Sequence, residues 1–160
     1  QVAQAQAAFS ACNSTLAKKE DATAQLNGLQ NNFAKTNYAS LASLQMAAAL
    51  AGEGKFEQAQ VPLQWVLQHG QLENQGAARL HLADVLVQLN KKDEALKVLD
   101  TPVAHFDVAF ANKKADIYLM GQDAGKAREV VQNALDNAKK ATPIDVVAVD
   151  ALEQKLKFLP

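Results

Sequence analysis

The chain has a single cysteine, Cys12, among its 160 residues. One cysteine excludes an intrachain disulfide and a thiolate metal cluster, and it is compatible with either cytosol or periplasm. No run of about 18 apolar residues occurs, so the sequence predicts no membrane-spanning helix within these residues. Seven glycines and four prolines leave few helix breakers in a sequence dominated by Ala, Leu and Gln, which favours an all-α fold.

The chain also lacks an excess of either charge, with 16 basic and 17 acidic residues. Duplex nucleic acid is attracted by clustered positive charge. The lysine pairs here are scattered along the sequence: Lys18–Lys19, Lys91–Lys92, Lys113–Lys114 and Lys139–Lys140. The sequence therefore predicts no nucleic acid partner.

Apolar residues recur at helical spacing along almost the whole chain, and no strand alternation is evident. The expected helices are 2–17, 21–34, 38–52, 55–69, 73–89, 92–100, 106–120, 123–140 and 144–158. The connections between them are short, as in GEG, NKK and GQDAG. Short loops between helices of this length imply antiparallel hairpins packed side by side.

Pairs of alanines separated by eleven residues occur three times: Ala47 and Ala59, Ala83 and Ala95, and Ala115 and Ala127. Small side chains on two antiparallel helices let the helix axes approach closely, where a leucine would hold them apart. An apolar residue follows the second alanine by four positions in every copy: Leu63, Leu99 and Val131. The three pairs therefore predict a repeated helical hairpin.

This pattern resembles the tetratricopeptide repeat (TPR), which places small residues at two fixed positions with a period of about 34 residues. The resemblance implies an all-α, TPR-like right-handed α-solenoid of antiparallel helical hairpins, forming a single domain over residues 1–160. The expected parts are N-terminal helices at 1–37, repeats at 38–72, 73–105 and 106–141, and a C-terminal capping helix at 142–160.

A closer resemblance is carried by FAKTNYASLASLQMAAALAGEGKFEQAQVPLQWVL, which runs from Phe33 to Leu67. Three later segments fit the same family: ARLHLADVLVQLNKKDEALKVLD, ANKKADIYLMGQDAGKAREVVQNAL and LEQKLKFLP. Together they resemble the periplasmic TPR-like domain of the ancillary subunit of the bacterial Sec translocon, the YfgM-like proteins. KTNYASLASLQMA carries most of the likeness.

Members of that family are single-pass inner-membrane proteins with a periplasmic repeat domain. The resemblance therefore implies a non-enzymatic scaffold for protein–protein interaction during protein export. The implied partners are translocon subunits, a membrane-anchored periplasmic chaperone and exported client proteins. The chain starts at Gln1, without Met, inside a helical pattern. We therefore expect an upstream membrane anchor outside these 160 residues, through which alone the domain meets the membrane.

The sequence contains no catalytic or metal motif, so we expect no enzyme activity, no cofactor and no metal. The three histidines lack the spacing of metal ligands. Cys12 has no nearby histidine to activate it, and we expect it to be a small buried hydrophobe. We expect Phe56 and Trp65 to belong to the core, because both fall on a helical apolar stripe.

By analogy with the repeat, the first helix of each copy directs a row of side chains to a concave face. These are the candidate protein-binding groove: Leu41, Leu44, Ala48, Leu80, Asp84, Val87, Asn112, Asp116 and Leu119. Repeat proteins that bind a peptide carboxylate line this groove with Lys, Arg and Asn. Asn112 is the one obvious candidate of that kind here, so the sequence disfavours a carboxylate clamp.

The apolar part of the predicted groove has two interpretations. The amphipathic helix 144–158 could fill it, or the groove could receive an apolar segment of a partner. The function has alternatives as well. One is a generic TPR adaptor in another cell-envelope assembly, and another is a helical regulator that binds a small molecule between its helices.

Overall fold

A computed structural model describes all residues from 1 to 160. It contains nine α-helices and no strand, which confirms the all-α prediction. The helices are α1 (Val2–Ala17), α2 (Thr23–Asn32), α3 (Asn37–Gly52), α4 (Phe56–His69), α5 (Leu72–Gln88), α6 (Lys92–Val98), α7 (Asp107–Met120), α8 (Ala124–Lys140) and α9 (Val146–Phe158). None of these helices is both long enough and apolar enough to cross a bilayer.

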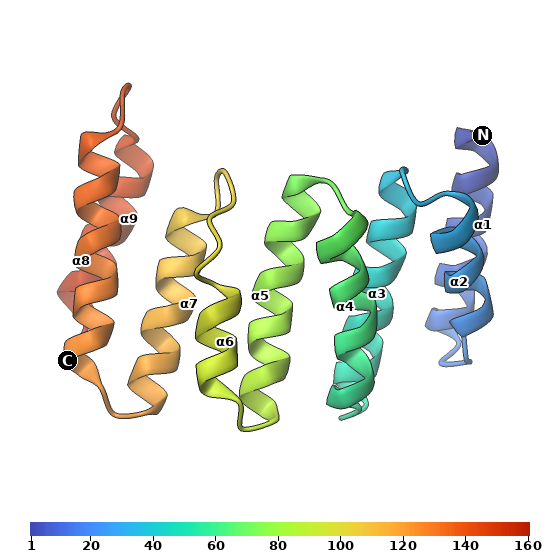
Figure 1. The fold of residues 1–160 in the computed structure, drawn as a ribbon, viewed down its shortest axis with the longest axis horizontal. Coiled ribbons are helices and arrows are strands. Elements are labelled where there is room, and N and C mark those ends of the chain that lie inside the picture. Colours follow the sequence, from blue (N-terminus) through green and yellow to red (C-terminus); the bar gives the residue numbers. More distant parts are fainter. The chain divides into compact units, whose positions relative to one another are not determined.

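The chain divides into two compact units, which we call the N-terminal unit (1–91) and the C-terminal unit (92–160). The boundary falls inside the range 73–105 that the sequence predicts as the second repeat. In the N-terminal unit, α3 is the central helix and packs on α1, α2, α4 and α5 (Figure 1). In the C-terminal unit, α7 packs on α6, α8 and α9, and α8 also packs on α9.

The repeated alanines are all buried, as the spacing predicts. None of them is more than 3% exposed: Ala47, Ala59, Ala83, Ala95, Ala115 and Ala127. In the C-terminal unit, Ala115, Ala127 and Val131 belong to one core cluster, together with Leu135 and Leu152. Because the cluster joins residues of α7, α8 and α9, the small side chains lie where these helices pack together.

Three helix ends differ from the prediction for local reasons. The last helix begins at Val146 rather than 144, because the Asp145 carboxylate accepts a hydrogen bond from the Ala148 N–H at 3.0 Å and caps the helix. The second helix spans 23–32 rather than 21–34, and the Asp21 carboxylate, ahead of it, accepts from the Thr23 N–H at 2.9 Å. The sixth ends at Val98 rather than 100, since its last turn tightens to i→i+3 hydrogen bonds.

The turns that follow α1, α3, α5 and α7 share one backbone geometry. The second residue beyond each helix has a positive φ: Lys19 (58°), Gly54 (77°), Asn90 (60°) and Gln122 (60°). The next N–H donates to a carbonyl five residues earlier, as from Lys55 to Leu50 at 2.8 Å. This left-handed ending provides a partner for a carbonyl that the helix leaves unpaired. The pair α1 and α2 therefore has the same turn as the three predicted repeats.

Cys12 has a structural position that this shared turn explains. It lies seven residues before Lys19, as Ala47 lies seven residues before Gly54. Cys12 is fully buried in a cluster with Leu29 and Met46, which confirms the prediction of a small buried hydrophobe. Burial raises the pKa of its thiol, because the thiolate would lose its hydration.

We predict opposite effects on stability at two of the turns. Gln122→Gly relieves the left-handed strain of a side chain and should stabilise the protein by about 1 kcal/mol. Gly54→Ala introduces that strain and should destabilise it by a similar amount. Urea unfolding measures both. Gly52→Ala is the control, since its site in α3 is open and needs no positive φ, and it should not destabilise the protein. A stabilising Gly54→Ala would contradict the assignment of these turns.

We also predict that Cys12 resists alkylation by iodoacetamide in the native protein and reacts once urea unfolds it. Since burial raises the pKa of the folded thiol, the unfolded thiol ionises first as the pH rises. Stability should therefore be complete below the unfolded pKa of about 8.5 and fall above it. Cys12→Ala is the control and should remove this fall. Rapid labelling of the native protein would contradict the burial of this thiol.

Candidate functional site

The predicted groove residues of the N-terminal unit lie on α3 and α5, which pack on each other. Leu41 is 38% exposed, and Ala48 and Asp84 are exposed as well. The other three are half-buried: Leu44, Leu80 and Val87. This part of the predicted groove therefore offers both apolar and polar side chains to solvent.

The predicted residues of the C-terminal unit lie on α7, next to α9. The Lys155 ammonium of α9 donates to the Asp116 carboxylate at 2.6 Å. Leu119 packs against the core cluster that contains Leu152 of α9. Asn112 is half-buried, and its carbonyl oxygen accepts no hydrogen bond. The helix at the C-terminus thus engages residues that the sequence assigns to the groove of the third repeat.

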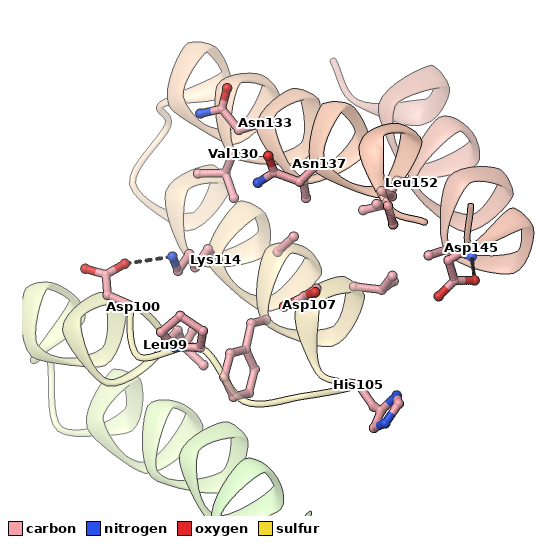
Figure 2. Close-up of a pocket in the computed structure, with 18 residues that line it drawn as sticks. Leu99, Asp100, His105, Asp107, Lys114, Val130, Asn133, Asn137, Asp145 and Leu152 are labelled. Carbon is pink, nitrogen blue, oxygen red and sulfur yellow. Dashed lines mark hydrogen bonds and ion pairs between the residues drawn. The ribbon is translucent and has the colours of Figure 1, made fainter. Parts of the chain in front are cut away.

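A groove of about 530 Å³ lies elsewhere in the C-terminal unit, where α7 and α8 run side by side (Figure 2). We call it the α7–α8 groove. Its apolar lining includes Ala111 of α7, Val130 of α8 and Leu152 of α9. Leu152 is only 1% exposed, so it connects this surface to the core. Helix packing therefore places an apolar floor beneath the groove.

The polar groups of the α7–α8 groove lie around that floor. At one end, the Lys114 ammonium pairs with the Asp100 carboxylate at 2.7 Å (Figure 2). At the other end the Asp145 carboxylate already caps α9. Asn133 and Asn137 lie one helical turn apart on α8 and line the groove. Because an ion pair and a capping carboxylate are already satisfied, the amide side chains are the groups best suited to bind a ligand's polar atoms.

A second groove, of about 790 Å³, lies in the N-terminal unit between α2 and α4. None of the predicted groove residues lines either groove. The sequence analysis considered only the first helix of each hairpin, whereas both grooves take much of their lining from the second. One available signal was the spacing of Asn133 and Asn137, which interrupt the apolar positions Val130, Ala134 and Ala138 of α8.

The structure brings together no group of three or more His, Cys, Asp or Glu side chains that could hold a metal ion. His69 instead stacks on Trp65, with ring centroids 4.8 Å apart. Trp65 was expected in the core, and it is half-buried, packing against the cluster of the N-terminal unit while also lining the second groove. Phe56 is likewise only half-buried.

We predict that apolar burial holds α9 on the C-terminal unit more strongly than its ion pair does. Leu152→Ala should cost about 2–5 kcal/mol of unfolding free energy, because it removes a fully buried side chain. Asp116→Asn should cost about 1 kcal/mol or less, since the Asp116 side chain is 48% exposed. Urea unfolding at low and high salt measures both, and only the second effect should shrink with salt. A larger loss for Asp116→Asn would contradict this account.

Comparisons with known proteins agree with this architecture. The tetratricopeptide repeat-like domain family matches residues 1–159. A protein of Neisseria gonorrhoeae named ancillary SecYEG translocon subunit is 34% identical over 149 residues, which make up 89% of this chain and 68% of that protein. No solved structure matched the chain. The match over nearly the whole chain and the all-helical fold with its repeated turn show that the chain belongs to the tetratricopeptide repeat-like family of ancillary SecYEG translocon subunits.

Proposed function

We propose that this chain is a non-enzymatic scaffold that associates with the Sec translocon on the periplasmic side of the inner membrane. The observation that carries the proposal is the 34% identity to an ancillary SecYEG translocon subunit across most of the chain. In this proposal an anchor outside the described residues attaches the domain to the membrane. A membrane-anchored periplasmic chaperone and exported clients are its further partners.

The geometry supports binding as the activity. The α7–α8 groove combines an apolar floor with amide side chains and an ion pair that is already formed. Amides donate and accept hydrogen bonds without changing protonation, so they suit recognition of another chain. The family's paired helices also present long rigid surfaces, which favour protein interfaces.

We assign the translocon contact to the exposed part of the predicted groove in the N-terminal unit. Leu41 and Ala48 on α3 are exposed, and Leu80 on α5 is half-buried. Asp84 and Val87 extend the same row on α5. An apolar row of this kind with a polar edge suits a protein partner whose own surface is apolar at the centre.

We predict that photo-crosslinkers at positions 41 and 48 of the full-length protein capture translocon subunits in membranes. A crosslinker at Glu153, exposed on α9, is the positional control and should capture much less. Leu41→Glu should reduce capture from position 48 while leaving the fold intact, because Leu41 is already 38% exposed. Leu72→Glu on α5, at a 65% exposed leucine, is the matched control.

Two results would contradict the proposal. Capture of no translocon or chaperone component at any position would overturn the translocon association itself. Capture from Glu153 alone would overturn the assignment to α3 and α5 and would place the contact on the C-terminal helix. Circular dichroism of each variant separates loss of binding from loss of fold.

A further inference from the structure

We propose that the N-terminal unit binds an extended, uncharged and apolar stretch of another polypeptide in the α2–α4 groove, which has a volume of about 790 Å³. This deepens the proposed function by naming the chemistry of a client segment, and it rests on that function only in taking the ligand to be a protein. The site differs from the α3 and α5 surface assigned to the translocon, since none of those residues lines this groove.

The groove exists because of how three helices pack. Helices α2 and α4 both pack on α3 and not on each other, so α3 forms the floor between them (Figure 1). Leu26 of α2, Met46 of α3 and Pro62 of α4 are buried along this floor. Trp65 is half-buried beside them, and Val61 is 68% exposed. An apolar ligand side chain would therefore meet aromatic and aliphatic surface.

Side-chain amides form much of the groove wall and have no partner within the chain. These amides are Asn27 on α2 and Gln58, Gln64 and Gln68 on α4. Gln60 points elsewhere on the same helix, and its amide donates to the Glu57 carboxylate at 3.3 Å. Each groove amide offers one acceptor and donor hydrogens, which match the C=O and N–H groups of an extended main chain. The wall therefore favours a ligand whose backbone is unpaired.

Pro62 adds a main-chain acceptor to the same wall. It lies inside α4 and has no N–H, so the Gln58 carbonyl lacks the donor that an α-helix normally supplies four residues later. Gln58 and Pro62 both line the groove, which places this carbonyl on the groove side of the helix. A ligand N–H would satisfy it. A bound helix would not, because its own N–H groups are already hydrogen-bonded.

Charge also selects the ligand. The charged lining residues are Lys19, Glu20, Asp21, Glu53 and Lys55, from the α1–α2 and α3–α4 turns. They carry both signs, and Lys55 already pairs with Glu53 at 3.0 Å. A charge at the centre of the ligand would lie over Met46 and Trp65 without a partner, which is costly. The wall from Gln58 to Gln68 spans about 15 Å, enough for about four or five extended residues.

The test uses Trp65, the single tryptophan of the chain, as a fluorescent reporter. The probe is a synthetic eight-residue peptide of Ser, Val, Leu and Gln, blocked at both ends and titrated into the whole 160-residue chain. We expect a saturable blue shift of the emission. A peptide with aspartates at its two central positions, and one methylated at alternate main-chain nitrogens, should each bind at least about tenfold more weakly.

A pair of matched variants tests the location. Val61→Glu should weaken binding of the probe peptide about tenfold or more, because it brings a charge to the apolar part of the groove. Val147→Glu makes the same change at an 80% exposed valine of α9 and should leave binding unchanged. Both sites are exposed, so both variants should fold, which circular dichroism checks.

Several results would overturn the inference. These are equal affinity for the charged or methylated peptide, tighter binding of a stapled helical peptide, no emission change with any peptide, or unaltered binding by Val61→Glu. A concentration-dependent shift without peptide would make a second copy the occupant and would also overturn it. The assay contains no translocon, so its failure leaves the crosslinking result standing. Failure of the crosslinking leaves the peptide result standing in turn.

Discussion

The spacing between paired helices in this chain is set by the small side chains at their contacts, and much of the fold follows from that spacing. The six repeated alanines are at most 3% exposed, and Cys12 takes the corresponding position before the first turn. Larger side chains there would force the helices apart or strain the core by about 1–3 kcal/mol. The left-handed turn at Lys19, Gly54, Asn90 and Gln122 lets the chain reverse directly after the first helix of each pair, so that close packing begins at once.

Close packing within the pairs leaves space between their second helices and the next element along. In the N-terminal unit, α2 and α4 share α3 as a common support and do not touch, which opens one groove. In the C-terminal unit, the other groove forms along α7 and α8, with Leu152 of α9 beneath it. Both have apolar floors and amide walls. Such surfaces recognise other chains by shape and hydrogen bonding, which agrees with the scaffold role that we propose.

The sequence predicts the helices well, because apolar periodicity and the alanine spacing are local properties. It does not predict the turn after α1. There α2 begins four residues after Lys19, whereas α4 begins two residues after Gly54, so the second small position loses its phase. It does not predict the grooves either. Whether Val61 and Trp65 face a cavity or a neighbour depends on the separation of α2 and α4, which no local pattern encodes. Likewise, only tertiary packing brings Lys155 to Asp116.

The central claim is that the exposed side of α3 and α5 is where this scaffold meets the translocon. Hydrogen exchange of the chain, measured with and without purified translocon in lipid nanodiscs, tests it most directly, because a bound surface opens less often. The account predicts slower exchange in 37–52 and 72–88 when the translocon is present, with 146–158 unchanged. Unchanged exchange throughout the chain, or slowing confined to α9, would contradict it.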